Sequence, residues 1–463
     1  MSENNLEYIA KIQELEKSLS AITKENRELL TRNLELIEQN RELVEKTEKL
    51  SSKINFESAD KKSLRYKMVT VFFADIKGFS KLSSKDNAEL LIDELDSFFL
   101  ILDEIIEKHN IKKISSIGDT LMCAGGIPKK NRTNPIEMIL AAIEIQDKLI
   151  QFQTELFGAD KKIWEISMGI HTGPVVAAEI GKKKISYELK GETVNIASRI
   201  ESACEPGKII ISEMTRELVS EYFRCNYIGK IPVKYVGDIN LYQVKGFTPT
   251  YSIDNNGLLP NKKFTIKFQL IKFDDLEEFM LDKLERELPK YLYYHNLKHT
   301  IDVGIQVEIL GRGENITDEE MLLLKTAALF HDSGQSIQTN GHELIGTKIA
   351  SNILPKFGYS SEQITAINEI IMATKLPPEP KTLLQNIICD ADLDYLGRSD
   401  FIPVSNMLYK ELHEQNLIGS INDWNKLQVK FLSIHQYFTE TGNKLREVNK
   451  QTQIERLKSE IKD

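Results

Sequence analysis

The sequence predicts a multidomain protein in which an N-terminal parallel coiled coil is followed by an α+β domain and a C-terminal all-α domain. Three observations support this prediction: leucines recur every seven residues near the N-terminus, short apolar runs alternate with helical patterns in the middle, and helical periodicity with sparse glycine dominates residues 264–463. A chain of 463 residues, 41% of them hydrophobic, is long enough for two or three domains that each have a core.

The first 56 residues contain no Gly or Pro and carry a heptad repeat. Leucine occupies most d positions from Leu15 onward, and the a positions include Asn26, Asn33 and Asn40. Asn at a positions lowers stability but favours a parallel, two-stranded pairing in one register, because each Asn can bond its twin. We therefore expect residues 1–56 to form a coiled coil that makes the protein a homodimer; a lone solvated helix is the alternative.

The middle of the chain, residues 57–250, alternates strand and helix patterns, which predicts an α+β domain. The expected strands are 67–75, 111–117, 120–125, 163–171, 207–211 and 240–246, and the expected helices are 85–109, 134–157 and 191–204. Residues 251–263 are rich in turn-forming residues and predict a linker, and residues 264–463 predict the all-α domain.

Two apolar strands of the α+β domain deliver carboxylates to their ends. The stretch VTVFFADIKGFS ends its apolar run at Asp75, and ISSIGDTLMCAGG carries Asp119 in a glycine turn. Paired carboxylates suit a hard cation such as Mg²⁺, which takes oxygen ligands and keeps positions for substrate phosphates. The turn after the first carboxylate is suited to offer backbone N–H groups to a polyphosphate, and it consists of Ile76, Lys77, Gly78 and Phe79. Ordinary strand ends and turns are the alternative interpretation.

A third stretch, GETVNIASRIE, places an amide and a guanidinium on one face of a helix, because Asn195 and Arg199 are four residues apart. Such a pair is suited to hold a ribose and a phosphoryl group while charge shifts in a transition state. Together with GIHTGPVVAAEIG, the stretches FADIKGFS, SIGDTLMCAGG and GETVNIASRIE resemble the class III nucleotidyl cyclases, the adenylate and guanylate cyclase family, in order and spacing over about 180 residues.

The resemblance implies a ferredoxin-like α+β fold that works as a head-to-tail homodimer. Asp75, Ile76 and Asp119 of one subunit are implied to hold two Mg²⁺ or Mn²⁺ ions, and Asn195 and Arg199 are implied to reach the site from the other subunit. These groups would convert a nucleoside triphosphate into a 3′,5′-cyclic nucleotide and pyrophosphate through a two-metal clamp. The coiled coil would raise the local concentration of the partner domains.

Two positions depart from the family's usual base-reading pattern. The family places a Lys or Glu four residues before the second metal Asp, and a Thr, Asp or Cys just ahead of the Gly that opens the Asn/Arg helix; this chain has Ser115 and Glu188 there. An ionised Glu only accepts hydrogen bonds, which favours a base edge with N–H donors, such as guanine or the amino group of cytosine or adenine. The base therefore stays open, and CTP and UTP remain candidates.

Histidines cluster in the predicted all-α domain. The stretches YLYYHNLKHTIDV, AALFHDSGQ and CDADLDYLG supply His295, His299, His331, Asp332, Asp390 and Asp392. Neutral imidazoles and carboxylates suit transition metals, which lower the pKa of bound water and make it a nucleophile. A lone histidine pair is more often structural, so the prediction depends on all three stretches together.

These stretches resemble the HD superfamily of metal-dependent phosphohydrolases over about 150 residues. The resemblance implies that a divalent transition metal is bound by His299, His331, Asp332 and Asp392. Asp390 is the second candidate for the last place, and His295 is implied to be a general acid to the leaving oxygen, as in the similar YHN stretch of cyclic nucleotide phosphodiesterases. Those enzymes carry a further His where this chain has Gln335, and His342 with Glu343 is the candidate replacement.

Composition excludes several classes of protein. A net charge of −9 argues against a general nucleic-acid binder, which would carry a surplus of Lys and Arg. The four cysteines form no C-x-x-C pair, which indicates a reducing cytosol, and no apolar run approaches the length of a membrane span. We therefore expect a cytoplasmic protein.

The resulting hypothesis is a dimeric cyclase whose HD domain hydrolyses a phosphoester, with the cyclic nucleotide itself among the candidates. In the alternative, the HD domain binds a nucleotide without turnover and regulates the cyclase. A structural coiled-coil scaffold with degenerate domains is the third interpretation, and the intact set Asp75, Asp119, Asn195 and Arg199 argues against it.

Overall fold

The computed structural model describes residues 63–77, 88–117, 120–157, 164–180, 186–253 and 257–461. The predicted coiled coil at residues 1–56 lies outside the described residues, as do Gly78, Phe79 and Asp119. Within the described ranges, no helix is both long enough and apolar enough to cross a membrane. All four cysteines are free thiols.

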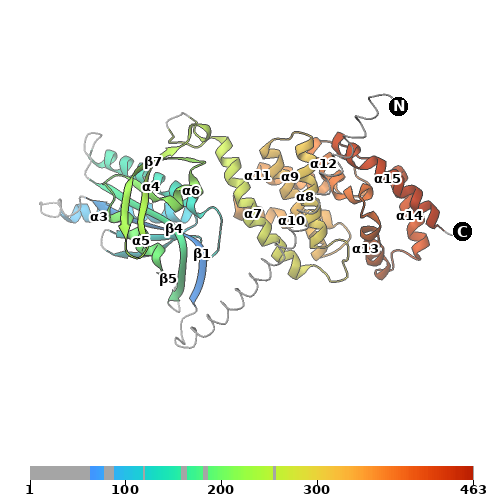
Figure 1. Cartoon of the computed structure of the whole chain (residues 1–463), viewed down its shortest axis with the longest axis horizontal. Helices are drawn as coiled ribbons and strands as arrows, with labels where there is room; N and C mark the ends of the chain where they lie inside the picture. The colour runs from blue at the N-terminus through green and yellow to red at the C-terminus, as the bar shows by residue number, and fades with distance from the viewer. Residues whose placement is uncertain are drawn as a thin grey trace, which may run out of the picture. The chain divides into compact units, whose positions relative to one another are not determined.

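A mixed sheet and its helices occupy the described residues up to Phe247 (Figure 1). The strands are β1 (Ser63–Lys77), β2 (Ile111–Ile117), β3 (Thr120–Gly125), β4 (Glu165–Ile180), β5 (Ser186–Lys190), β6 (Ile209–Ser212), β7 (Phe223–Val233) and β8 (Gly237–Phe247). They pair in the order β2-β3-β1-β4-β6-β8-β7, and β5 pairs with β4. The helices between the strands are α3 (Ala88–Lys108), α4 (Asn134–Phe157), α5 (Glu192–Ser202) and α6 (Glu213–Val219). The predicted α+β class of this domain is confirmed.

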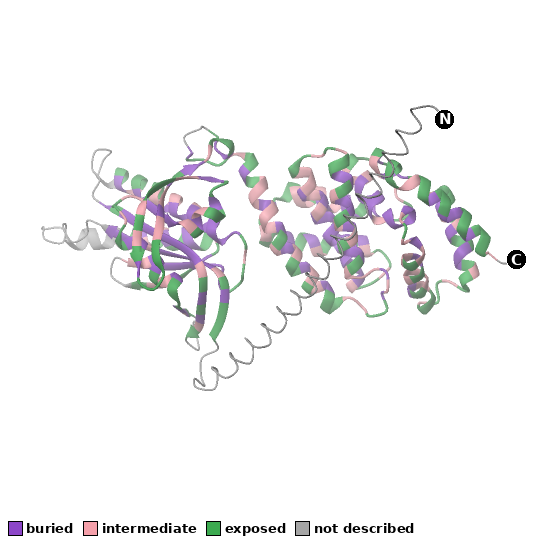
Figure 2. Ribbon diagram, in the orientation of Figure 1, coloured by how far each residue is buried: buried purple, intermediate pink, exposed green. Residues whose placement is uncertain are grey.

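The strands bury side chains on both faces of the sheet. In β6, Ile209 and Ile211 belong to the core that includes α3 and α4, whereas Ile210 belongs to the core of the opposite face with α5. This two-residue alternation is the property of a strand with helices on both sides. Figure 2 shows the inner strands mostly in the colour of buried residues. The sheet is therefore a fixed platform for side chains at its strand ends.

Sequence patterns locate some elements of the sheet domain and miss others. Three elements, β2, β3 and α4, coincide with the predicted ranges 111–117, 120–125 and 134–157. The patterns miss β5, β7 and α6. β7 contains Gly229 and Pro232 and exposes many side chains, so its pairing with β8 rather than its own hydrophobicity keeps it extended. β4 continues past Gly173 and Pro174, which predict a turn in isolation.

The chain from Lys262 to Ile461 forms helices and no strand. The α-helices are α7 (Lys262–Glu287), α8 (Leu297–Gly313), α9 (Asp318–Phe330), α10 (His342–Ile353), α11 (Ser361–Ala373), α12 (Leu383–Asp392), α13 (Phe401–Glu414), α14 (Ile421–Ile434) and α15 (Glu440–Glu460). One apolar cluster contains side chains from each of the helices α7 through α12, and a second cluster contains side chains from α13, α14 and α15. The predicted all-α class of this region is confirmed.

Helix α7 contributes side chains to both cores. Asn261 caps its first turn, because its Oδ1 accepts a hydrogen bond from the backbone N–H of Phe264 at 3.1 Å. The ring of Phe264 packs in the core of the sheet domain, with its centroid 4.9 Å from that of Phe247. Further along the same helix, Leu276 is fully buried in the helical core. The segment 251–263, predicted as a linker, thus leads into a helix shared by the two cores, and the domain boundaries stay a prediction.

Candidate functional sites

Asp75 stands near the end of β1, an inner strand of the sheet. Val69 and Val71 of the same strand are inaccessible to solvent, and Asp75 is 8% exposed. Asp75 pairs across the ladder with Thr120, whose Oγ1 donates a hydrogen bond to Asp75 Oδ1 at 3.5 Å. The strand therefore delivers a buried carboxylate, which is the kind of oxygen donor that suits a hard divalent cation.

The neighbours of this carboxylate in the predicted metal and polyphosphate site are described in part. Ile76 is 2% exposed, and Lys77 is the last residue of β1. Asp119 immediately precedes the strand β3 in the sequence, and it lies outside the described residues together with Gly78 and Phe79. The assignment of these residues to one site therefore stays a prediction.

Asn195 and Arg199 lie on the exposed face of α5. The opposite face of the helix, with Ile196 and Ile200, is buried against the sheet. Arg199 Nη1 donates a hydrogen bond to the carbonyl oxygen of Pro232 at 3.3 Å. The helix thus presents an amide and a guanidinium toward solvent, one turn apart.

The position of α5 on the sheet depends on glycine. A Cβ atom at Gly169 of β4 would lie 2.2 Å from the backbone nitrogen of Glu201 and 2.8 Å from the carbonyl oxygen of Ala197. Gly191, the N-cap of α5, has a φ of +136°, which L side chains rarely adopt. Gly169 therefore lets α5, the helix that carries the amide and the guanidinium, pack closely against the sheet. Gly191 allows the backbone conformation with which that helix begins.

The two predicted base-reading residues lie on different strands. Ser115 is half-buried in β2, where the register pairs it with Met122. Glu188 is half-buried in β5. A hydroxyl group both donates and accepts, whereas an ionised carboxylate only accepts. Base selection by this pair stays a prediction.

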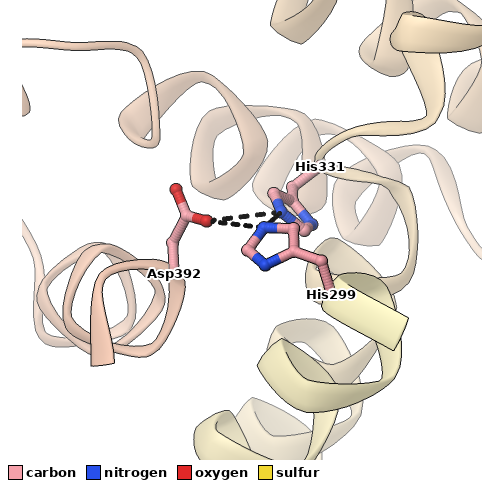
Figure 3. A group of neighbouring side chains, drawn as sticks. All are labelled: His299, His331 and Asp392. Atoms are coloured by element: carbon pink, nitrogen blue, oxygen red, sulfur yellow. Dashed lines mark hydrogen bonds and ion pairs between the residues drawn. The ribbon is translucent and has the colours of Figure 1, made fainter. Parts of the chain in front are cut away.

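His299, His331 and Asp392 form a compact cluster of metal-ligand type in the helical domain (Figure 3). They come from α8, from the C-terminal end of α9 and from the C-terminal end of α12. His299 Nε2 lies 3.2 Å from His331 Nε2 and 3.0 Å from Asp392 Oδ1. Asp332 adds its Oδ2, which lies 3.4 Å from His299 Nε2 and 3.3 Å from His331 Nε2. The fold thus brings four predicted ligands together.

The spacing of His299, His331 and Asp392 fits ligands around one cation. Two ligands that are each about 2.1 Å from a metal, at angles between octahedral and tetrahedral, lie roughly 3.0–3.4 Å apart. The separations between the two histidine nitrogens, and between each of them and the oxygens of Asp332 and Asp392, run from 3.0 to 3.5 Å. The two facing Nε2 atoms avoid repulsion only when a proton or a cation lies between them.

Local hydrogen bonds orient the histidine side chains. His331 Nδ1–H donates to the carbonyl oxygen of Ala328 at 2.8 Å, which directs Nε2 into the cluster. The side chain of Asn296 caps α8 by accepting a hydrogen bond from the backbone N–H of Lys298 at 2.9 Å, which fixes the turn that carries His299. A hydrogen bond from the second ring nitrogen, like that of His331 to Ala328, is common in metal-binding histidines.

The charges of the cluster stabilise one another. Burial by itself lowers the pKa of His331, but the carboxylates of Asp332 and Asp392 outweigh burial and hold that pKa well above its usual range. Burial by itself raises the pKa of both carboxyl groups, but the neighbouring histidines hold both pKa values well below their usual range. Both carboxylates are therefore ionised at neutral pH, which is the state that binds a cation.

His295 stands beside the cluster and is held by a buried carboxylate that the sequence patterns miss. Its Nδ1 lies 2.5 Å from Oε1 of Glu411, a residue that is 1% exposed. Glu411 Oε2 accepts hydrogen bonds from the backbone N–H groups of Tyr294 and His295, at 2.8 and 3.1 Å. The two partners are 116 residues apart in sequence, so no local spacing connects them.

Asp390, the second candidate for the last ligand position, lies outside the cluster. Its Oδ1 accepts a hydrogen bond from the backbone N–H of Phe438 at 2.8 Å. Its Oδ2 accepts from the backbone N–H and the hydroxyl of Thr439, at 2.8 and 2.7 Å. Thr439 is the N-cap of α15. Asp390 therefore anchors the start of that helix, while Asp392 faces the histidines.

Two family models match the chain. Residues 62–246 match the adenylate and guanylate cyclase catalytic domain, and residues 296–394 match the HD domain. The chain therefore contains a class III adenylate/guanylate cyclase catalytic domain followed by an HD domain, which confirms both predicted resemblances. The cyclase domain implies the chemistry of a phosphorus–oxygen lyase.

Curated proteins that are similar to the chain include two guanylate cyclases. Receptor-type guanylate cyclase gcy-4 of Caenorhabditis elegans is 33% identical over 218 residues, which make up 46% of this chain and 19% of that protein. Guanylate cyclase 2G of Mus musculus is 33% identical over 184 residues, which make up 39% of this chain and 16% of that protein. The similarity thus spans less than a fifth of the length of these relatives.

Solved structures that are similar to the chain include an adenylyl cyclase and a guanylate cyclase domain. The adenylyl cyclase CyaB from P. aeruginosa is 30% identical, and the match covers 40% of this chain and 95% of that one with a TM-score of 0.37. The guanylate cyclase domain of RhGC from Catenaria anguillulae, in complex with GTP, is 29% identical, and the match covers 39% and 97% with a TM-score of 0.35.

Proposed function

We propose that the protein is a homodimeric nucleotidyl cyclase that converts a nucleoside triphosphate into a 3′,5′-cyclic nucleotide and pyrophosphate. The observation that supports this proposal is the different exposure of the predicted groups: Asp75 is buried near a strand end, whereas Asn195 and Arg199 stand on an exposed helix face, where a second chain can reach them. A second copy, paired head to tail, would bring its helix face to the carboxylates of the first. The β1-α3-β2-β3-α4-β4 order supports a ferredoxin-like core.

Each residue of this composite site has a role that suits its chemistry. Asp75 and Asp119, with the backbone carbonyl of Ile76, would hold Mg²⁺ or Mn²⁺, which supplies positive charge to the triphosphate and to the ribose 3′-oxygen. The turn that begins at Lys77 would contact the polyphosphate through its backbone N–H groups. From the other subunit, Asn195 would position the ribose, and Arg199 would stabilise the charge that develops at the α-phosphate.

The base of the substrate can be identified by testing four nucleoside triphosphates. Ser115 and Glu188 would read the base, and guanine, adenine and cytosine all offer N–H donors to a carboxylate. Incubation of the full chain with ATP, GTP, CTP or UTP and Mn²⁺ should yield a cyclic product from at least one of them. Asp75→Ala should lower the rate to background, whereas Asp103→Ala, which changes an exposed carboxylate, should keep it. No cyclic product from any of the four would contradict the proposal.

For the HD domain we propose metal-dependent hydrolysis of a phosphoester. A transition metal, which supplies Lewis-acid charge and an activated water, would be held by His299, His331, Asp332 and Asp392. His295 would protonate the leaving oxygen. Burial by itself lowers the pKa of His295, but the hydrogen bond to Glu411 and nearby carboxylates raise it above the usual value, so the ring holds the proton that a general acid needs.

A pocket lies beside the metal cluster. It is lined by His299 and Asp392 of the cluster, by Lys298 and Arg398, by the carboxylates of Asp302 and Asp394, and by apolar side chains that include Met407. Because Arg398 is paired with Asp400 and Asp302, the bound metal and Lys298 would have to supply the positive charge for a phosphate, and the apolar walls suit a planar or apolar group attached to it. A cyclic nucleotide has both parts and is therefore among the candidate substrates.

Metal content and hydrolysis test this second activity together. Asp392→Asn should lose the bound metal and the Mn²⁺-dependent hydrolysis of bis(p-nitrophenyl) phosphate and of cyclic nucleotides. Asp390→Asn, on the same helix, is the matched control and should keep the metal, because Asp390 bonds to the start of α15 instead. An unchanged metal content in His331→Ala would refute the ligand assignment.

Regulation without hydrolysis is the second candidate role of the HD domain. The observation that favours it is α7, which places Phe264 in one core and Leu276 in the other. In that case a nucleotide would bind to the HD domain and change the cyclase rate without being consumed. Mn²⁺-dependent hydrolysis by the full chain separates the two roles, because only the first role yields a hydrolysis product.

A further inference from the structure

We propose that Asp394 is a specificity-determining residue of the HD domain, which accepts a hydrogen bond from an N–H group of the base in a nucleotide substrate. The inference rests on the proposed phosphohydrolase function and narrows its substrate from phosphoesters in general to esters of nucleotides. Asp394 begins the short 3₁₀ helix η4 (Asp394–Gly397), which follows α12 and the predicted metal ligand Asp392.

The pocket beside the metal cluster extends along α8. His299 and Gln306 both line it, and they lie on one face of the helix because seven residues separate them. Seven residues span about 10 Å along a helix axis. A substrate whose phosphate lies at the His299 end would therefore place the group attached to that phosphate near Gln306.

Arg446 holds Asp394 beside Gln306. Its Nε donates a hydrogen bond to Asp394 Oδ1 at 2.7 Å, and its Nη2 donates to Gln306 Oε1 at 3.4 Å. Gly397 allows this close approach, because a Cβ atom there would lie 2.5 Å from the carbonyl oxygen of Arg446. Arg446 belongs to α15, which lies beyond the residues 296–394 that match the HD domain. The carboxylate is thus fixed by a part of the chain outside the matched segment.

The second oxygen of Asp394 has no hydrogen-bond partner in the described part of the chain. This Oδ2 atom is buried, the side chain is 2% exposed, and the residue lines the pocket. Buried oxygens of native proteins normally have a partner, so an acceptor without one at a pocket wall points to a ligand that has a donor. The other carboxylates of the wall are engaged, because Asp392 lies 3.0 Å from His299 Nε2 and Asp302 lies 3.8 Å from Arg398.

The aromatic walls of the pocket suit a flat ring. Tyr294 and Tyr395 line it with ring centroids 5.4 Å apart, and Tyr395 is stacked on Phe401 at 6.1 Å and an interplanar angle of 11°. Aromatic side chains stack on every nucleobase, since each base has a π-face. Every nucleobase also offers an N–H group that the carboxylate of Asp394 can accept, whereas a p-nitrophenyl ring offers none. The pocket would therefore distinguish a nucleotide ester from a p-nitrophenyl ester.

A comparison of substrates tests this role of Asp394. The full chain is assayed with Mn²⁺ on the 3′,5′-cyclic nucleotides of adenine, guanine, cytosine and uracil, and on bis(p-nitrophenyl) phosphate. In Asp394→Asn, the ratio of kcat/KM for the best cyclic nucleotide to kcat/KM for bis(p-nitrophenyl) phosphate should fall about 10-fold to 100-fold, because the amide presents an N–H group to the N–H group of the base. A merely structural defect would lower both values and leave their ratio.

Asp390→Asn is the matched control for this ratio. Asp390 is also buried beside the start of α15, but its carboxylate bonds to Phe438 and Thr439. Its replacement should therefore keep the ratio of the parent protein.

Each outcome of this experiment decides the inference. An unchanged ratio in Asp394→Asn, or a parent that cleaves bis(p-nitrophenyl) phosphate but no cyclic nucleotide, would overturn it and leave the proposed hydrolase intact. Faster cleavage of p-nitrophenyl phosphorylcholine than of any cyclic nucleotide would also overturn it, since the pocket would then recognise an ammonium group. A parent that cleaves no phosphoester would contradict both the inference and the proposed function. If Asp394→Asn loses its native circular dichroism, Asp394→Glu, which keeps the charge but moves the oxygens, decides the question and should lower the same ratio.

Discussion

At the residue scale, several buried polar groups bond to partners that are far away in the sequence. Glu411 holds His295, and Asp390 anchors the start of α15. In the sheet domain, His171 Nδ1 lies 2.7 Å from Ser212 Oγ. Each of these partners is at least 41 residues away in sequence, so the interactions exist only in the folded chain.

His171 should make the stability of the sheet domain depend on pH. The residue is 8% exposed, and burial lowers its pKa from 6.5 to about 4. Between these two values the unfolded chain binds a proton that the folded chain does not bind. The stability is therefore complete above pH 6.5 and is lost as the pH falls, by about 2 kcal/mol between pH 7 and pH 5.

Urea unfolding at pH 7 and pH 5 measures this loss. Fluorescence of Trp164, a buried residue of the same core, reports on the sheet domain in a Trp424→Phe chain. His171→Gln keeps a polar group but does not titrate, so its free energy of unfolding should fall by about 2 kcal/mol less than that of the parent. Parallel pH dependence in the two proteins would exclude His171 as the source.

At the element scale, α5 should tolerate no side chain at Gly169. A methyl group there would push the backbone of Glu201 and Ala197 away from the sheet and displace Asn195 and Arg199. Because a misplacement of about 1 Å can cost roughly 10²-fold in rate, Gly169→Ala should lose cyclase activity on that scale.

The control for this prediction is a glycine with free space around it. Gly304→Ala in α8 meets no atom within 4 Å and should keep the cyclase rate. Trp164 fluorescence checks that Gly169→Ala still folds. Full cyclase activity in a folded Gly169→Ala protein would contradict the role assigned to the packing of α5.

Elements and ligands that depend on local pattern are predictable from the sequence, and those that depend on distant partners are not. The ranges of β3 and α4 follow from their own apolar periodicity, and His331 with Asp332 follows from one short motif. Asp390 and Asp392 are two residues apart on one helix, so they point about 200° away from each other, and only the fold shows which one faces the histidines. Glu411 reaches the site from a helix beyond the residues that match the HD domain.

At the scale of the whole molecule, α7 should couple the unfolding of the two domains. The helix cannot unwind without exposing Phe264 in one core and Leu276 in the other. Trp164 and Trp424 report on the sheet domain and the helical domain, and they are the only tryptophans in the chain. In single-tryptophan versions of the protein, the two thermal transitions should coincide.

A break in α7 should separate these transitions. Lys272→Pro interrupts the helix between the two core stretches at a cost of about 3 kcal/mol. Lys272→Ala removes the same ion pair to Glu137 but keeps the helix, so it is the matched control and should leave the transitions together. Separate transitions in the parent protein would show that α7 does not couple the domains.

The most direct test of the central claim, a cyclase site shared between two chains, is complementation. Asp75→Ala and Arg199→Ala should each be inactive alone, because every site in either homodimer lacks one group. Co-expression of the two variants should restore about a quarter of the parent rate, since half of the dimers are mixed and each mixed dimer has one intact site. Restored cyclic nucleotide synthesis in the mixture is the result that the account predicts, and a mixture as inactive as its components, beside an active parent, would contradict it.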